Sequence, residues 1–140
     1  GIVVAERAAG MDTTMSYRTV PRVTFTNPEI ASVGITEAQA DERGIEVSIG
    51  RFPYSASGKA VAEGEAAGFV KVIADAADGV IMGGVVAGAG ASELVHEIAL
   101  AVEARIEAET VGAMIHAHPS LPESVMEAFE ALRGMSIHSL

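Results

Sequence analysis

Short stretches of alternating apolar and polar residues predict the strands of this chain. In residues 20–26, Val23 and Phe25 lie on one face, and Val47 and Ile49 repeat the spacing within a second stretch. The pair Asp78-Gly79 is typical of a hairpin turn, so the strands on either side of it are expected to run antiparallel. Further strands are expected at residues 29–34, 45–52, 69–74 and 80–87. The Gly-rich segment 53–68 is interpreted as a loop with room for one short strand around residues 59–62.

Helical spacing dominates the C-terminal half. Leu94, Ile98, Ala101 and Val102 form one apolar stripe, and Leu100 lies alone on the opposite, polar side. A single leucine there is normal, but it could also mark a second buried face, as in a subunit interface. Helices are expected at residues 37–43, 93–105, 110–115 and 121–133, and residues 1–10 are interpreted as the end of a helix that stops at Gly10. The pattern predicts an α+β fold, an antiparallel sheet of about five strands flanked by helices.

Two local motifs mark helix starts. Thr36 and Gln39 have the spacing of a capping box. Gly88 and Gly90 lie between a strand and a helix, where glycines can accompany nucleotide binding. The third glycine of that fingerprint is replaced by Glu93, whose carboxylate would repel phosphate. We therefore interpret this segment as a tight strand exit, with Ser92 as N-cap.

The residues that carry candidate chemistry are concentrated in 116–123, His-Ala-His-Pro-Ser-Leu-Pro-Glu. Imidazole titrates near neutral pH, and a carboxylate on one ring nitrogen orients the ring while the other nitrogen transfers protons. His118 and Glu123 are the candidate pair. They are five residues apart, so one continuous helix would not stack them. Pro119 disfavours helix at His118, which we therefore place in a bend ahead of a helix that begins near Glu123.

Two other interpretations of this segment remain open. Ser120 and Glu123 have capping-box spacing, with Pro122 in the first turn, so Glu123 could serve only as a cap. His116 and His118 could form half of a metal site, but no third ligand of suitable spacing is visible. We therefore predict no metal.

Composition excludes several classes of function. The formal net charge is −10, which disfavours nucleic acid and anionic membranes as partners. There are no cysteines, hence no thiol nucleophile or disulfide. No apolar run is long enough to span a membrane and no secretory signal is evident, so a cytoplasmic location is expected.

From Val20 onward the chain resembles the C-terminal interface (dimerisation) domain of dihydrolipoamide dehydrogenases, which are flavin-dependent pyridine nucleotide–disulfide oxidoreductases. Three motifs carry the resemblance. They are residues 20–34 (Val-Pro-Arg-Val-Thr-Phe-Thr-Asn-Pro-Glu-Ile-Ala-Ser-Val-Gly), residues 68–73 (Gly-Phe-Val-Lys-Val-Ile) and residues 116–123. The family usually has Thr in place of Ser120 and a small polar residue in place of Pro122.

The resemblance implies a domain organisation. Residues 1–19 would be the tail of a preceding FAD domain and its connection, and residues 20–140 the interface domain. The family's cysteine pair and its dinucleotide fingerprints are not among these residues, so the chain alone is expected to bind no cofactor and to be inactive. FAD and NAD are the cofactors of the full-length enzyme, and its partners are a second copy in a homodimer and lipoyl-bearing 2-oxo acid dehydrogenase or glycine cleavage components.

By the same resemblance, His118 and Glu123 would act on the partner subunit's disulfide, and the His118–Pro119 bond would be cis. The alternatives are a stand-alone dimerisation or scaffold module, and the same domain of a glutathione or mercuric reductase.

Overall fold

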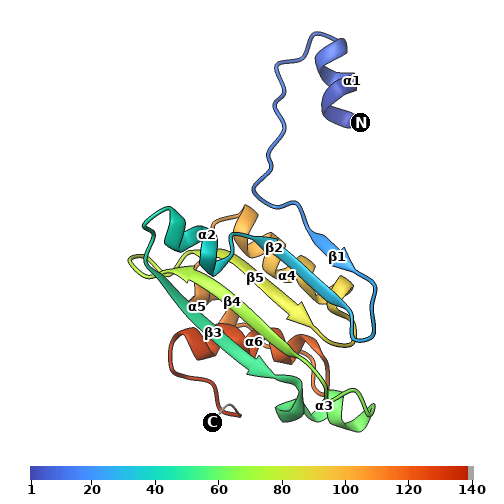
Figure 1. Cartoon of the computed structure of the whole chain (residues 1–140), viewed down its shortest axis with the longest axis vertical. Coiled ribbons are helices and arrows are strands. Elements are labelled where there is room, and N and C mark those ends of the chain that lie inside the picture. Colours follow the sequence, from blue (N-terminus) through green and yellow to red (C-terminus); the bar gives the residue numbers. More distant parts are fainter. Residues whose placement is uncertain (139–140) are drawn as a thin grey trace.

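The computed structural model describes residues 1–138 and has the expected α+β architecture (Figure 1). One five-stranded antiparallel sheet has the order β1-β2-β5-β4-β3. Its strands are β1 (Arg22–Thr24), β2 (Ile30–Gly34), β3 (Val47–Pro53), β4 (Phe69–Asp75) and β5 (Ile81–Ala87). The α-helices are α1 (Ile2–Ala8), α2 (Glu37–Glu42), α3 (Gly58–Ala62), α4 (Ala91–Glu103), α5 (Ala108–Gly112) and α6 (Pro122–Leu132), and η1 (Tyr54–Ala56) is a 3₁₀ turn.

Helices α4 and α6 pack on one face of the sheet and enclose the main core (Figure 1). The stripe predicted on α4 is buried, whereas Leu100 is 63% exposed, as its position predicted. On α6, Val125 and Phe129 are fully buried. The other face is covered in part by α2, where Ala40 packs with Ile73 in a second, smaller cluster.

Local turn and cap chemistry follows the predictions at several points. The capping box of Thr36 and Gln39 forms in both directions. The β4–β5 turn has Gly79 at φ +72°, and Asp78 Oδ1 accepts a hydrogen bond from the Val80 N–H at 3.0 Å. The two strands pair antiparallel as expected.

The segment after β3 differs from the prediction, because residues 59–62 are helical rather than extended. The Ser57 hydroxyl accepts a hydrogen bond from the Ala60 N–H and caps α3, and Gly64 ends the helix region at φ +78°. A Ser cap followed by good helix formers outweighs the short alternation that suggested a strand.

The start of α4 also differs. Its N-cap is Gly90, at φ +70°, rather than Ser92. Ser92 donates two hydrogen bonds to Glu29 Oε2, from its N–H at 3.2 Å and its hydroxyl at 2.9 Å. Gly88 packs against the ring of buried Tyr54, whose hydroxyl donates to the Ala89 carbonyl at 3.0 Å. Burial, with Glu29 nearby, raises the pKa of Tyr54 to about 12. The Glu29 carboxylate at the start of α4 would repel a phosphate, and the Tyr54 ring fills the space beside Gly88. A dinucleotide phosphate therefore does not fit at this turn.

Helix α1 stands apart from the sheet at the end of an extended connection (Figure 1). None of its residues is buried, and Ile2 and Val4 are 77% and 71% exposed. Its helical state and the turn at Gly10, with φ +85°, match the expectation for residues 1–10. In the part of the chain that the structure describes, no helix is both long and apolar enough to cross a bilayer.

The contact of α6 with β3 depends on Gly50. A Cβ at this position would overlap the carbonyl oxygen of Ala128 and lie 2.9 Å from the backbone nitrogen of Leu132. Both are backbone atoms of α6, which cannot move aside as a flexible side chain can. The absence of a side chain at Gly50 therefore sets how closely the helix approaches the sheet.

We expect Gly50→Ala to lower the free energy of unfolding by about 1–3 kcal/mol, because the added methyl group forces α6 away from β3. Gly58→Ala is the matched control, since a Cβ at Gly58 meets nothing within 4 Å and its φ is not in the left-handed region. That control should leave stability unchanged or raise it by up to about 1 kcal/mol. Urea titrations followed by circular dichroism would measure both, and equal effects of the two substitutions would contradict this account.

The segment after α6 is held by Glu127, which is 4% exposed. Its carboxylate accepts hydrogen bonds from the Ser136 hydroxyl at 2.6 Å, the Ile137 N–H at 3.1 Å and His138 Nδ1 at 2.6 Å. Burial raises the pKa of Glu127, but these hydrogen bonds outweigh it and hold the pKa below its ordinary value of 4.5. The sequence pattern had shown this segment only as a tail.

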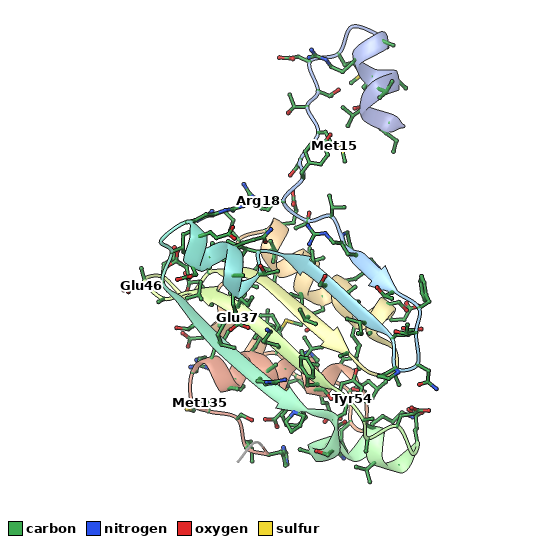
Figure 2. All side chains as sticks on the ribbon, in the orientation of Figure 1. Met15, Arg18, Glu37, Glu46, Tyr54 and Met135 are labelled. Carbon is green, nitrogen blue, oxygen red and sulfur yellow. The ribbon has the colours of Figure 1, made fainter. Side chains whose placement is uncertain are left out.

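Because the folded pKa of Glu127 is lowered, its contribution to stability is complete above pH 4.5 and is lost as the pH falls through the folded value. We expect Glu127→Gln to cost about 1–3 kcal/mol at neutral pH. The difference from wild type should shrink as the pH falls below 4.5. Denaturation at a series of pH values would measure it, with Glu46→Gln at an exposed site (Figure 2) as control. A difference that does not vary with pH would contradict this assignment.

Candidate active site

The candidate site lies in the loop between α5 and α6. Pro119 follows His118 through a cis peptide bond, as the family resemblance implied. His118 is outside any helix, and Glu123 is in the first turn of α6. Because α6 packs on β3 and β4, the position of Glu123 is set by the core of the domain.

The structure brings His118 and Glu123 together. His118 Nδ1 lies 2.8 Å from Glu123 Oε1, and the other carboxylate oxygen, Oε2, accepts a hydrogen bond from the Ser120 N–H at 2.8 Å. The His118 side chain is 81% exposed, whereas that of Glu123 is 26% exposed. Within residues 1–138, Nε2 of His118 has no hydrogen-bond partner. It is therefore open to a molecule approaching from solvent.

The carboxylate of Glu123 is held in its charged form. Burial raises its pKa, but the Ser120 N–H hydrogen bond and the His118 ring outweigh this effect and lower the pKa below its ordinary value. A charged carboxylate at Nδ1 favours the tautomer with the proton on Nδ1, which leaves Nε2 as the proton acceptor. The pair can thus take up a proton at Nε2 and stabilise the resulting imidazolium.

The predicted capping box at Ser120 forms only in part. Glu123 accepts a hydrogen bond from the Ser120 N–H, but the N-cap is Leu121. The Ser120 hydroxyl is buried and has no hydrogen-bond partner among residues 1–138. The helix begins at Pro122, one residue later than the motif requires, although Leu121 already has helical dihedrals. Pro122 is in the first turn as expected. Glu123 therefore acts as a cap and as a partner of His118 at the same time, through different oxygens.

His116 has a different environment. Its side chain is 7% exposed, with Nε2 2.9 Å from Glu97 Oε1 on α4 and Nδ1 3.1 Å from the Met114 carbonyl oxygen. Both ring nitrogens are therefore engaged, and the ring ties the loop to α4. The interaction with Glu97 was not predicted, because no local spacing rule links residues 19 positions apart.

The two histidines face separate carboxylates and do not converge. No group of three or more His, Cys, Asp or Glu side chains suited to a metal ion occurs among residues 1–138. In the described residues, the fold therefore brings no third metal ligand to His116 and His118.

An apolar hollow of about 340 Å³ lies beside His116. Leu100 and Ile115, at 63% and 99% exposure, are among its lining residues. It also includes Met114, Ile106 and Val111. We call these five residues the apolar surface. In the sequence, the only signal of this surface was Leu100 on the polar side of its helix. The other members come together through the packing of α5 against α6 and of α6 against α4.

Residues 20–129 match the model of the dimerisation domain of pyridine nucleotide-disulphide oxidoreductases. The chain is 45% identical over 140 residues to dihydrolipoyl dehydrogenase of Haloferax volcanii and 44% identical over 138 residues to that of Bacillus subtilis. These alignments cover 100% and 99% of this chain but 30% and 29% of the relatives, so the chain spans about a third of their length.

Solved structures show the same relationship. LpdA from Mycobacterium tuberculosis superposes with a TM-score of 0.83 at 32% identity, over 94% of this chain and 28% of LpdA. The flavoprotein disulfide reductase RclA from Escherichia coli shares the fold, with a TM-score of 0.83 at 24% identity, over 92% of this chain and 30% of RclA. Since the family match extends over most of the chain, the protein belongs to the pyridine nucleotide-disulphide oxidoreductase dimerisation domain family.

Proposed function

We propose that this chain is the dimerisation part of a flavin-dependent dihydrolipoyl dehydrogenase, in which His118 and Glu123 form the acid–base pair. The observation that carries the proposal is the 2.8 Å contact of His118 Nδ1 with Glu123, which leaves Nε2 exposed. The chain has 44–45% sequence identity to dihydrolipoyl dehydrogenases along nearly its whole length. This similarity supports the choice of their reaction over those of other disulfide reductases.

In the proposed reaction the substrate is a reduced lipoyl dithiol. A thiol attacks a disulfide only as its thiolate, and its ordinary pKa of about 8.5 keeps most of it protonated at neutral pH. His118 Nε2 takes the thiol proton, and the resulting thiolate attacks the disulfide of the partner subunit. A mixed disulfide forms as the original S–S bond breaks and its other sulfur leaves as a thiolate. Glu123 stabilises the imidazolium through Nδ1 and keeps the ring oriented.

The cofactors of the proposed enzyme, FAD and NAD, are held by other domains. In this chain, the glycine turn before α4 is occupied by Tyr54 and Glu29, which does not fit a dinucleotide phosphate. We accordingly assign residues 1–19 to the end of a preceding FAD domain and its connection, and residues 20–140 to the interface domain. The chain alone lacks the disulfide and is inactive, and the enzyme acts in the cytoplasm on lipoyl-bearing components of 2-oxo acid dehydrogenase or glycine cleavage complexes.

In the full-length enzyme, we expect His118→Ala to lower lipoamide turnover by about two to four orders of magnitude, the usual contribution of a positioned base. Glu123→Gln should cost less, because a hydrogen bond to the ring remains while the charge is lost. His116→Gln should cost least, because both nitrogens of His116 are engaged within the fold. Steady-state kinetics would measure the three variants, each first shown to be dimeric and flavin-loaded.

Normal turnover of His118→Ala would overturn the acid–base assignment and favour a purely structural module. A large loss in His116→Gln with little loss in His118→Ala would show that the other histidine is the base. Unaltered flavin spectra in all variants separate a chemical defect from a failure to assemble.

The apolar surface supports the second part of the proposal, a two-fold homodimer. Leu100 and Ile115 are large and exposed, and both line the hollow beside His116. Burial of such side chains is a main source of interface free energy. A two-fold axis would place the same surface of both copies in contact. We propose that this surface contributes to the dimer contact.

We expect Ile115→Glu to raise the dimer dissociation constant by about tenfold to a hundredfold, because it places a charge in an apolar contact. Ile49→Glu is the control, since Ile49 is exposed on β3, away from α4 and α5. Multi-angle light scattering over a concentration series would measure both variants. A monomer at all concentrations for wild type, or equal effects of the two substitutions, would contradict the proposed contact.

A further inference from the structure

A second hollow, of about 320 Å³, lies at the end of the sheet where the N-terminal connection reaches the domain. Four arginines line it, Arg18, Arg22, Arg43 and Arg105, above a floor that includes the buried side chains of Ile35 and Val102. Figure 2 labels Arg18 at this junction. The Thr19 hydroxyl donates to Glu103 Oε2 at 2.6 Å, which holds the connection against the end of α4 close to Arg105. We call this hollow the arginine pocket.

In the described part of the chain, these arginines differ from the other Lys and Arg side chains in having no charged or aromatic partner. The chain has nine Lys and Arg residues. The five outside the pocket each meet a carboxylate or a ring, in the pairs Arg7–Asp12, Lys59–Glu63, Lys71–Glu37, Arg133–Glu130 and Arg51–Phe69. Within residues 1–138, none of the four arginines of the pocket forms an ion pair. All four are exposed. In a chain of net charge −10, four unpaired cations at one place are available to an anion that is not part of the fold.

The charge of the pocket wall leads to the same conclusion. Two carboxylates, Asp75 and Asp78, also line it, and each has one oxygen engaged by a turn N–H, of Ala77 and Val80. Four guanidinium groups and two carboxylates leave a local charge of +2. Gln39 adds a donor, because its oxygen bonds the Thr36 N–H and its amide nitrogen is available.

The backbone of Arg105 provides an independent observation. It has φ +54° and is the one non-glycine residue with positive φ among residues 1–138. Four other helices end with a glycine in this left-handed position, namely Gly10 after α1, Gly44 after α2, Gly64 after α3 and Gly134 after α6. Glycine takes this conformation without strain and arginine does not. An arginine at the end of α4 therefore carries a conformational cost that its side chain must offset by another role.

The geometry also indicates the class of anion. The four guanidinium groups come from separate segments, the connection, β1, the end of α2 and the end of α4. A tetrahedral phosphate group offers several oxygens in different directions and can accept from arginines on separate segments, whereas a carboxylate accepts in one plane. We propose that the arginine pocket binds a small phosphate-bearing anion. This site is independent of the proposed acid–base function, because none of the four arginines belongs to the loop of His118.

Isothermal titration calorimetry on the full 140-residue chain tests the proposal, with inorganic phosphate, pyrophosphate and succinate as probes at constant ionic strength. We expect saturable binding of phosphate or pyrophosphate that is tighter than that of succinate. Arg105→Gly should weaken it by at least about tenfold, since one charged hydrogen-bond donor is lost. The same variant removes the strained backbone, so its melting temperature should stay equal or rise, which shows that the fold is intact.

Arg43→Gln is expected to weaken binding to a similar degree without any change at Arg105. Arg51→Gln removes the same charge from β3, outside the pocket, and should leave binding unaltered. The proposal is overturned if wild type shows no saturable binding of the phosphate probes, or if Arg105→Gly and Arg43→Gln bind them as wild type does. Equal affinity for succinate would overturn the assignment to phosphate.

Discussion

The close packing of α6 against β3 is the constraint on which the other features of this domain depend. Gly50 lets the backbone of the helix reach the sheet, and Val125 and Phe129 then fill the core between them. The same helix carries Glu123 at its first turn and Glu127 in its middle. One rigid element therefore holds the candidate catalytic carboxylate at one end and the C-terminal segment along its length.

The fold was largely accessible from the sequence because its determinants are local. Alternation identified the strands, helical spacing identified the buried side of α4, and the Thr36 box marked the start of α2 with its reciprocal hydrogen bonds. The departure of His118 from the helix also followed from a local rule, the restriction that proline places on the preceding residue. The 2.8 Å contact with Glu123 is the spatial result of that rule.

The features that were missed depend on tertiary contacts or on small differences in helix position. Ser92 does not cap α4, because its hydroxyl donates a hydrogen bond to Glu29, 63 positions away. Ser120 precedes the N-cap of α6 by one residue, so its capping box is incomplete. The short helix α3 depends on a single Ser cap within a segment whose composition suggests a loop. The arginine pocket collects residues from four separate segments, so neither charge runs nor spacing could reveal it.

The engagement of both His116 nitrogens has a consequence for the neighbouring His118. The contact of His116 with Glu97 attaches one end of the short loop to α4. The contact of His118 with Glu123 attaches the other end to α6. The loop that carries the exposed His118 imidazole is therefore attached to two different helices, α4 and α6. A ring held in this way loses little rotational freedom when a molecule binds at its exposed nitrogen, because the folding of the domain has already fixed its orientation.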